Sequence, residues 1–205
     1  MSSKNIASTK ISGSVKWLVK SSKDEWLRQA IDNPLEILLD HAHCERKAAG
    51  VAMQLMFRYV DEPGLSEVLS PLAREELEHY ERVLNLLKVK GKSLKPLPPP
   101  PYGSLLSSHI RKEEPFRMLD SFLVAGLIEA RSHERMSLLA VNLLDKELRE
   151  LYKDLMVSEA KHFGIYWNLA ASRFEREEII HRLEYLGSVE SRILSKLHPY
   201  PRIHS

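Results

Sequence analysis

Two copies of the pattern Glu-x-x-His, 83 residues apart, constrain this chain more than any other feature. The first is Glu76 with His79, and the second is Glu159 with His162. On an α-helix, residues three apart lie on one face across a single turn, so each pair presents a carboxylate beside an imidazole. A chain of this composition contains roughly one such pair by chance, and this chain has three. The pattern therefore needs a second, independent test.

Helical periodicity and turn signals divide the sequence, and no segment has the two-residue periodicity of a strand. Pro34 suits the first turn of a long helix, and the run Asp61-Glu-Pro-Gly64 reads as the turn after it. The expected long helices cover residues 34–60, 65–90, 115–142 and 145–172, and the expected shorter helices cover 22–31, 104–112 and 174–195.

The composition is typical of one folded domain, here residues 1–205. Hydrophobic residues make up 43% of the chain and charged residues 28%, and the net charge is +2, so no overall basic excess points to nucleic acid. The single cysteine, Cys44, excludes an intrachain disulfide and suits a small buried residue better than a reactive thiol. We expect a cytoplasmic protein without signal peptide or membrane span, with residues 1–15 loosely held, and monomeric or at most weakly dimeric.

The second test compares the two sides of each expected hairpin, because residues at one level of an antiparallel hairpin are equidistant from its turn. Glu45 and His79 have their midpoint at residue 62, inside the turn at 61–64. Glu129 and His162 have theirs between residues 145 and 146, at the break between the next two helices. Each Glu-x-x-His pair therefore faces a glutamate across its own hairpin, whereas the third pair, at residues 178 and 181, faces residues 167–170, which contain no carboxylate.

The faces that carry these glutamates are apolar, so all four carboxylates point toward the expected core. Buried carboxylates without partners are too costly to persist, and divalent cations would neutralise them. The alternative is a set of salt bridges with nearby arginines, but that alternative does not predict two matched hairpins. Oxygen-rich ligation with one imidazole per ion favours iron or manganese over zinc. The predicted ligands are Glu45, Glu76, His79, Glu129, Glu159 and His162, with Glu76 and Glu159 as the bridging pair.

The segment at residues 95–103 is rich in proline and separates the two helix pairs. It suits a stiff spacer that carries the chain along a bundle, or, alternatively, a ligand for proline-reading domains. With the spacer, the expected fold is all-α: an up-down four-helix bundle at about residues 34–172 with one long crossover, extra flanking helices, and an accessory C-terminal helix at 174–195.

The six-residue pattern resembles the ferritin-like di-iron carboxylate superfamily. More closely, the chain resembles the MiaE family of bacterial tRNA hydroxylases, which act on 2-methylthio-isopentenyl-adenosine. The segments that carry this likeness are residues 40–49 (DHAHCERKAA), 72–79 (LAREELEH), 128–135 (IEARSHER) and 158–162 (SEAKH). The resemblance implies two iron ions that use O2, with electrons from an external donor protein, to hydroxylate the isopentenyl side chain of the modified adenosine in tRNA.

Other residues have two interpretations each. Glu75 either orients a ligand histidine or is a plain surface charge, and His41 and His133 either line the site or are histidines of the core. The candidates for tRNA phosphate contacts, which are as readily part of a solvated face, are Arg46, Lys47, Lys88, Lys90, Lys92, Arg131 and Arg135.

Two other functions remain open from the residues alone. One is a ferritin-like or rubrerythrin-like protein that oxidises iron or scavenges peroxide, although the chain has no Cys-pair electron-transfer domain. The other is a helical adaptor without catalysis. The tyrosines near the ligands, Tyr80, Tyr152 and Tyr166, suit core packing better than a radical-generating site.

Overall fold

The computed structural model describes residues 16–205, so the expectation for residues 1–15 lies outside the described part of the chain. Within that part there are seven helices and no strand, and the all-α prediction is confirmed. The helices are α1 (Asp24–Asp32), α2 (Pro34–Arg58), α3 (Leu65–Val89), α4 (Tyr102–Ser107), α5 (Phe116–Asn142), α6 (Lys146–Ala171) and α7 (Arg176–Ile193).

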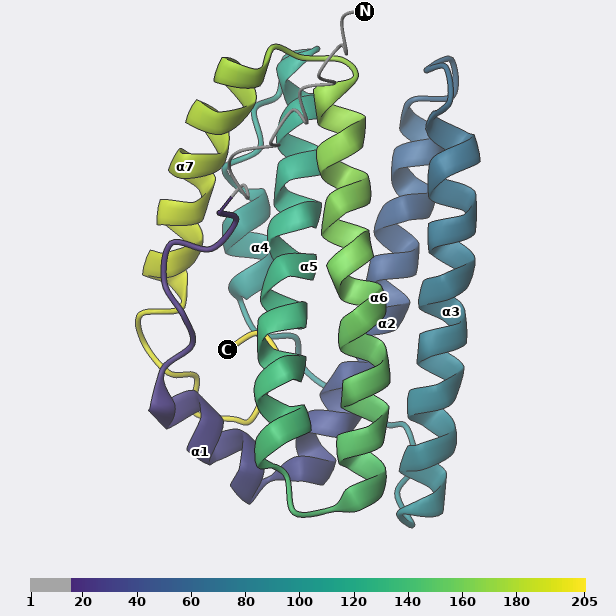
Figure 1. Ribbon diagram of the computed structural model, residues 1–205, viewed down its shortest axis with the longest axis vertical. Coiled ribbons are helices and arrows are strands. Elements are labelled where there is room, and N and C mark those ends of the chain that lie inside the picture. The colour runs from purple at the N-terminus through teal and green to yellow at the C-terminus, as the bar shows by residue number, and fades with distance from the viewer. Residues whose placement is uncertain (1–15) are drawn as a thin grey trace, which may run out of the picture.

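Four long helices, α2, α3, α5 and α6, form the bundle as two antiparallel hairpins (Figure 1). Gly64 precedes α3 with a φ of 72°, a left-handed conformation that glycine adopts without steric cost. Asp145 caps α6, because its side chain accepts hydrogen bonds from the backbone N–H groups of Glu147 and Leu148. Short turns of this kind hold the two helices of each hairpin in register.

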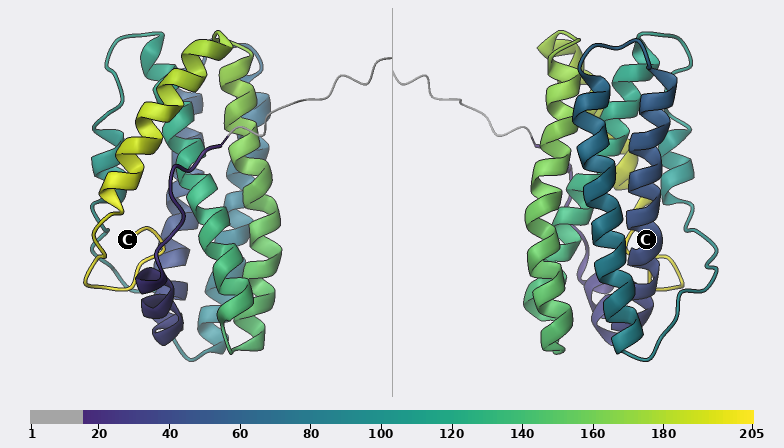
Figure 2. Two further views of the ribbon diagram at one scale, coloured as in Figure 1. Left: turned by 60° about the vertical axis from the view of Figure 1, so that its left-hand side comes forward. Right: turned by 90° about the vertical axis from the view of Figure 1, so that its right-hand side faces the viewer.

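The crossover between the hairpins returns the chain along the bundle, so α3 and α5 run in the same direction (Figures 1 and 2). Leu97 of the proline-rich spacer and Leu94 just before it pack against the core, which identifies the spacer as a part of the fold. The prediction of a ferritin-like bundle with one long crossover is confirmed.

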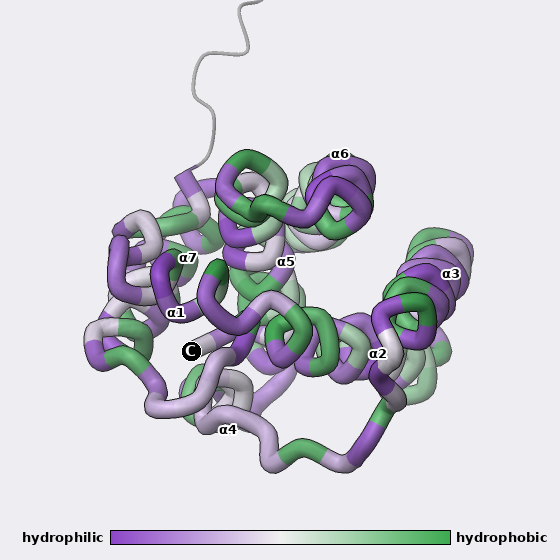
Figure 3. Tube along the Cα trace, turned by 90° about the horizontal axis from the view of Figure 1, so that it is seen from below, coloured by the Kyte–Doolittle hydropathy of each residue, from purple (hydrophilic) through white to green (hydrophobic). Residues whose placement is uncertain are grey.

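The flanking helices α1, α4 and α7 lie on one side of the bundle, beside α5 and away from α3 (Figure 3). Buried ion pairs attach α7: Arg131 Nε lies 2.7 Å from Glu190 Oε1, and Arg182 Nη2 lies 2.7 Å from Asp120 Oδ2. Between residues 16 and 205, none of the helices combines the length and the apolar character needed to cross a membrane.

The apolar core consists of two clusters, one toward each end of the bundle. In each of the four long helices, the residues of one cluster precede the predicted ligands and those of the other follow. In α2, for example, Leu38 and Ala42 precede Glu45, while Ala52 and Leu55 follow it. A layer of buried polar side chains therefore divides the core at one level of the bundle.

Candidate metal centre

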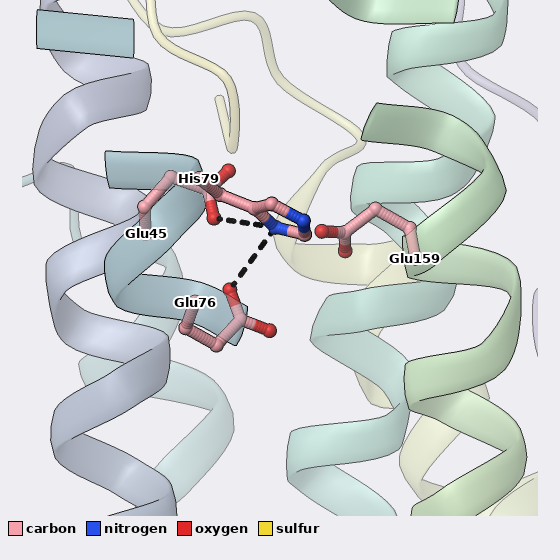
Figure 4. A group of neighbouring side chains, drawn as sticks. All are labelled: Glu45, Glu76, His79 and Glu159. Atoms are coloured by element: carbon pink, nitrogen blue, oxygen red, sulfur yellow. Dashed lines mark ion pairs between the residues drawn. The ribbon is translucent and has the colours of Figure 1, made fainter. Parts of the chain in front are cut away.

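All six predicted ligands lie in this polar layer, and none is more than 5% exposed. They form two overlapping groups, in each of which one possible ligand atom per residue lies within 4.8 Å of the others. The first group is Glu45, Glu76, His79 and Glu159 (Figure 4), and the second is Glu76, Glu129, Glu159 and His162. Glu76 and Glu159 belong to both groups, which is the position of carboxylates that bridge two ions.

The imidazoles face the carboxylates through their Nδ1 atoms. His79 Nδ1 lies 3.6 Å from Glu45 Oε2 and 3.9 Å from Glu76 Oε2. His162 Nδ1 lies 2.7 Å from Glu76 Oε1 and 3.8 Å from Glu159 Oε1. The two rings stand nearly parallel with centroids 5.7 Å apart. Each half of the bundle thus directs one imidazole nitrogen toward the shared glutamates.

The hydrogen bonding of these groups tests whether a cation suits them. Among residues 16–205, the buried polar atoms without a hydrogen-bond partner include atoms of five predicted ligands: Glu45, Glu76, His79, Glu159 and His162. Buried polar atoms are normally paired, so a concentration of unpaired ones in one layer requires an explanation. Two cations held by oxygen and imidazole ligands would satisfy the carboxylate oxygens and one nitrogen of each imidazole, and the donor set fits iron or manganese.

The electrostatics of the layer support the same conclusion. Burial raises the pKa of Glu129 to about 7, and burial together with repulsion from neighbouring glutamates raises the pKa values of Glu76 and Glu159 well above their usual range. Burial also raises the pKa of Glu45, but His41 and His79 outweigh it and lower that pKa overall. Without a cation, the layer therefore holds protons on some of its carboxylates.

Glu75 contacts the outer nitrogen of a predicted ligand. Its Oε2 lies 3.4 Å from His162 Nε2, while His162 Nδ1 faces the metal groups. Partial burial acts in the opposite direction, but His162 and a hydrogen bond from Ser158 lower the pKa of Glu75. An ionised carboxylate at this nitrogen orients the ring and fixes its tautomer, as carboxylates commonly do for metal-bound histidines.

His41 and His133 differ from each other. His41 is fully buried, its Nε2 contacts Glu45 Oε1, and its ring stacks on Tyr152. It therefore supports one ligand from behind. His133 belongs to neither group, does not line the pocket beside the carboxylates, and donates from Nδ1 to the carbonyl oxygen of Met156 at 2.8 Å. Half-buried His133 therefore contacts α6 and not the candidate ligands, and its role stays a prediction.

An apolar pocket of about 460 Å³ ends on Glu45, Glu76, Glu129 and Glu159. Ala48, Val51, Ala125 and Ile128 give it an apolar lining, and the small side chains of Ala48 and Ala125 on α2 and α5 leave space beside the polar layer. Gly126, on another face of α5, instead admits the indole of Trp17 so closely that a Cβ atom would overlap it.

Sequence reasoning missed the far wall of this pocket. Pro99, Pro100 and Tyr102 of the crossover and His204 of the C-terminal segment line it. These residues lie outside the long helices, so no periodicity relates them to the ligands. Cys44 also lines the pocket, and burial raises the pKa of its thiol, which leaves it protonated as expected for a buried rather than a reactive cysteine.

The predicted tRNA contacts divide into two sets. Arg46, Lys47, Lys88 and Lys92 are exposed, and half-buried Lys90 lies 2.6 Å from Asp145 and 2.5 Å from Glu147. The prediction is wrong for Arg131 and Arg135, which are 1% and 2% exposed. Their guanidinium groups are engaged inside the protein, by Glu190 for Arg131 and by Ser205 O for Arg135.

Comparison with known proteins agrees with this site. The family model described as tRNA-(MS[2]IO[6]A)-hydroxylase (MiaE) matches residues 9–205. This chain belongs to the MiaE family.

Two curated relatives of this MiaE-family chain are named tRNA 2-(methylsulfanyl)-N(6)-isopentenyladenosine(37) hydroxylase. The one from Pseudomonas putida is 36% identical, and the alignment covers 89% of this chain and 88% of the relative. The one from Salmonella typhimurium is 28% identical, and the alignment covers 88% of this chain and 84% of the relative. A solved structure, described as protein 43 with aldehyde deformylating oxygenase activity from Synechococcus, is 59% identical with a TM-score of 0.91, covering 93% of this chain and 96% of that chain.

The first prediction concerns metal binding. Glu76 belongs to both groups, so Glu76→Ala should remove bound iron almost entirely, whereas Glu78→Ala, at an exposed position of α3, should bind as much iron as the wild type. Iron is measured by elemental analysis after loading under anaerobic conditions, and circular dichroism checks that both variants fold. Equal iron in both variants would contradict this ligand assignment.

The second prediction concerns pH. Glu76, Glu129 and Glu159 have raised pKa values in the folded protein, so the stability that their protonated forms contribute is complete below the unfolded pKa of about 4.3 and is lost as pH rises through their folded pKa values. For Glu129 the folded pKa is about 7. The Tm of metal-free protein should fall between pH 5.5 and 8, and it should fall less in Glu129→Gln. Added Fe²⁺ should abolish most of the slope. The same slope in wild type and variant would refute this account.

Proposed function

We propose that this MiaE-family protein is a di-iron tRNA hydroxylase that acts on the isopentenyl side chain of 2-methylthio-isopentenyl-adenosine. The observation that carries the proposal is the apolar pocket of about 460 Å³ that ends on four buried carboxylates. An isopentenyl group is small, branched and apolar, and the small side chains of Ala48 and Ala125 leave room for such a group directly beside the candidate metal centre. The reaction would take place in the cytoplasm, where tRNA is found.

The residues present have distinct tasks in this proposal. The six buried glutamates and histidines hold two irons, which, when bound, supply O2-dependent oxidation with electrons from an external donor. Glu75 fixes the ring of His162, and His41 supports Glu45. The apolar lining excludes water from the reacting C–H bond and orients the side chain toward the carboxylate layer.

A wider groove of about 1030 Å³ adjoins the pocket and supports a nucleic-acid substrate. The two share Val51, Gln54, Ala125 and Ile128, so the groove lies directly beside the pocket. Basic side chains also line the groove: Arg58, Arg111, Lys112 and Arg117. Phosphates that flank an adenosine inserted into the pocket would meet these cations.

Phe57 adds an aromatic surface to the same groove. Its side chain is 78% exposed, so its ring is available to a ligand in the groove. Unpaired bases of RNA loops stack on exposed aromatic rings. We infer that Phe57 stacks on a base next to the modified adenosine while Arg58 and Arg117 contact the backbone. Lys47, which lines the pocket, and Arg46 beside it in the sequence remain candidates, and Lys88, Lys90 and Lys92 remain candidates for more distant contacts.

The third prediction tests the reaction itself. Iron-loaded protein is incubated with a chemical reductant, O2 and tRNA from a strain whose modified adenosine is not hydroxylated, and the digested nucleosides are analysed by mass spectrometry. The adenosine should gain one oxygen atom, and Glu76→Ala should produce none of this product. An unchanged nucleoside with iron-loaded wild-type protein would refute the assignment.

The fourth prediction tests the groove. Arg58→Glu and Arg117→Glu should each weaken tRNA binding, and the salt dependence of binding should fall by about one phosphate contact per variant. Iron content should not change. Lys153→Glu, at an exposed position of α6 that does not line the groove, is the matched charge-reversal control. Loss of binding in the control but not in the groove variants would refute the groove as the tRNA surface.

Aldehyde deformylation is a second candidate, because the solved relative at 59% identity is described with that activity. The apolar pocket would accept an alkyl chain as well as an isopentenyl group. Supplying a long-chain aldehyde instead of tRNA in the same assay, and measuring the hydrocarbon by gas chromatography, separates the two candidates. Iron oxidation or peroxide scavenging is the weaker alternative, since neither needs an apolar pocket with a basic groove.

A further inference from the structure

The C-terminal segment, residues 201–205, returns to the interior after α7. Arg202, Ile203, His204 and Ser205 are each at most 6% exposed, although the segment contains no helix. Figures 1 to 3 place the C-terminal end among α1, α4 and α5, and not at an end of the bundle. Burial of irregular backbone is costly unless its N–H and C=O groups are hydrogen-bonded. The hydrogen bonds of this segment therefore identify the elements that hold it in place.

Three helices anchor this segment. Trp26 Nε1 of α1 donates to the carbonyl oxygen of Arg202 at 3.0 Å, and the backbone N–H of Ile203 donates to Asp40 Oδ2 of α2 at 2.8 Å. Arg135 of α5 donates through Nη2 to the carbonyl oxygen of Ser205 at 2.8 Å. Hydrogen bonds from three separate elements define one position for the backbone on both sides of His204.

His204 is thereby placed against the pocket. Its ring stacks on Tyr102 with centroids 5.0 Å apart and an interplanar angle of 10°. Nε2 lies 3.2 Å from Ser132 Oγ, and Nδ1 lies 3.8 Å from Cys44 Sγ. All four of these side chains line the pocket that ends on the carboxylates. Burial and the nearby Arg135 and Arg131 lower the pKa of His204 well below its usual range, so the ring is neutral.

A second cavity, of about 260 Å³, lies on the other side of this ring. Its lining includes Pro100, Tyr102 and His204, which also line the metal-adjacent pocket, together with Leu197 and His198. These three shared residues separate the two spaces. Removal of the imidazole would join the pocket to the outer cavity.

We propose that the C-terminal segment is a wall of the active-site pocket and that His204, a positioning residue, closes that pocket against the outer cavity. The inference rests on the proposed function, because it assigns the wall the task of keeping water and small solutes away from the irons and the substrate. Exclusion of water directs an oxidation to the bound substrate and suppresses side reactions. The wall also limits how far a substrate group extends past the carboxylates.

The test compares His204→Ala, which removes the ring, with His204→Phe, which replaces it by another ring without hydrogen-bonding atoms. His198→Ala, which changes only the lining of the outer cavity, is the control. For each iron-loaded protein, the rate of iron removal by a chelator and the ratio of hydroxylated nucleoside formed to O2 consumed are measured. Iron content before chelation is determined first.

His204→Ala should load normally but lose iron several-fold faster and form less product per O2. His204→Phe should restore both values toward wild type, and His198→Ala should resemble wild type. Should His204→Ala fail to fold, His204→Val, which fills part of the space, is expected to show an intermediate rate of iron loss.

The proposal would be overturned if His204→Ala, or His204→Val in its place, lost iron at the wild-type rate and formed as much product per O2 as the wild type. His204→Phe as defective as His204→Ala would also overturn it, because it would assign the role to hydrogen bonding and not to closure. Absence of iron from the wild-type protein would instead refute the proposed function, so the two failures are distinguishable.

Discussion

Burial of four carboxylates in one layer of the bundle is the constraint on which the rest of this structure depends. Ionised carboxylates cannot remain together in an apolar interior without compensating charge. Two imidazoles in the layer do not balance them, and unpaired atoms remain on Glu76, Glu159 and both histidines. The apolar clusters above and below hold the helices at the level where two cations would complete the layer.

The two halves of the layer have similar ligands but different surroundings. Glu45 is supported by His41, whose ring stacks on Tyr152, while His162 contacts Glu75 at its outer nitrogen. Glu75 and Ser158 occupy equivalent positions, each directly before a glutamate of the layer, but only the first is acidic. Through Glu75, α3 of one hairpin contacts His162 of the other just outside the layer. This asymmetry gives the two candidate metal positions different electrostatic environments.

The pocket lies along α2 and α5, one helix from each hairpin, and the elements outside the bundle close it. The crossover contributes Pro99, Pro100 and Tyr102, and the C-terminal segment contributes His204. The helices hold the ligands rigidly, while the connecting segments define the size and the opening of the pocket. Substitutions in the connecting segments could therefore change the substrate preference without disturbing the layer of candidate ligands.

The sequence by itself determined the long helices and the six candidate ligands, because both follow from local spacing: Glu-x-x-His places two side chains on one helical face, and equal distances from a turn place a glutamate opposite. Tertiary structure alone decided which other polar residues face the site. Arg131 and Arg135 share a segment with Glu129 yet are buried against Glu190 and the C-terminal backbone, and His204 reaches the pocket from the far end of the chain. Contacts between segments distant in sequence leave no periodic signal, so only the folded chain reveals them.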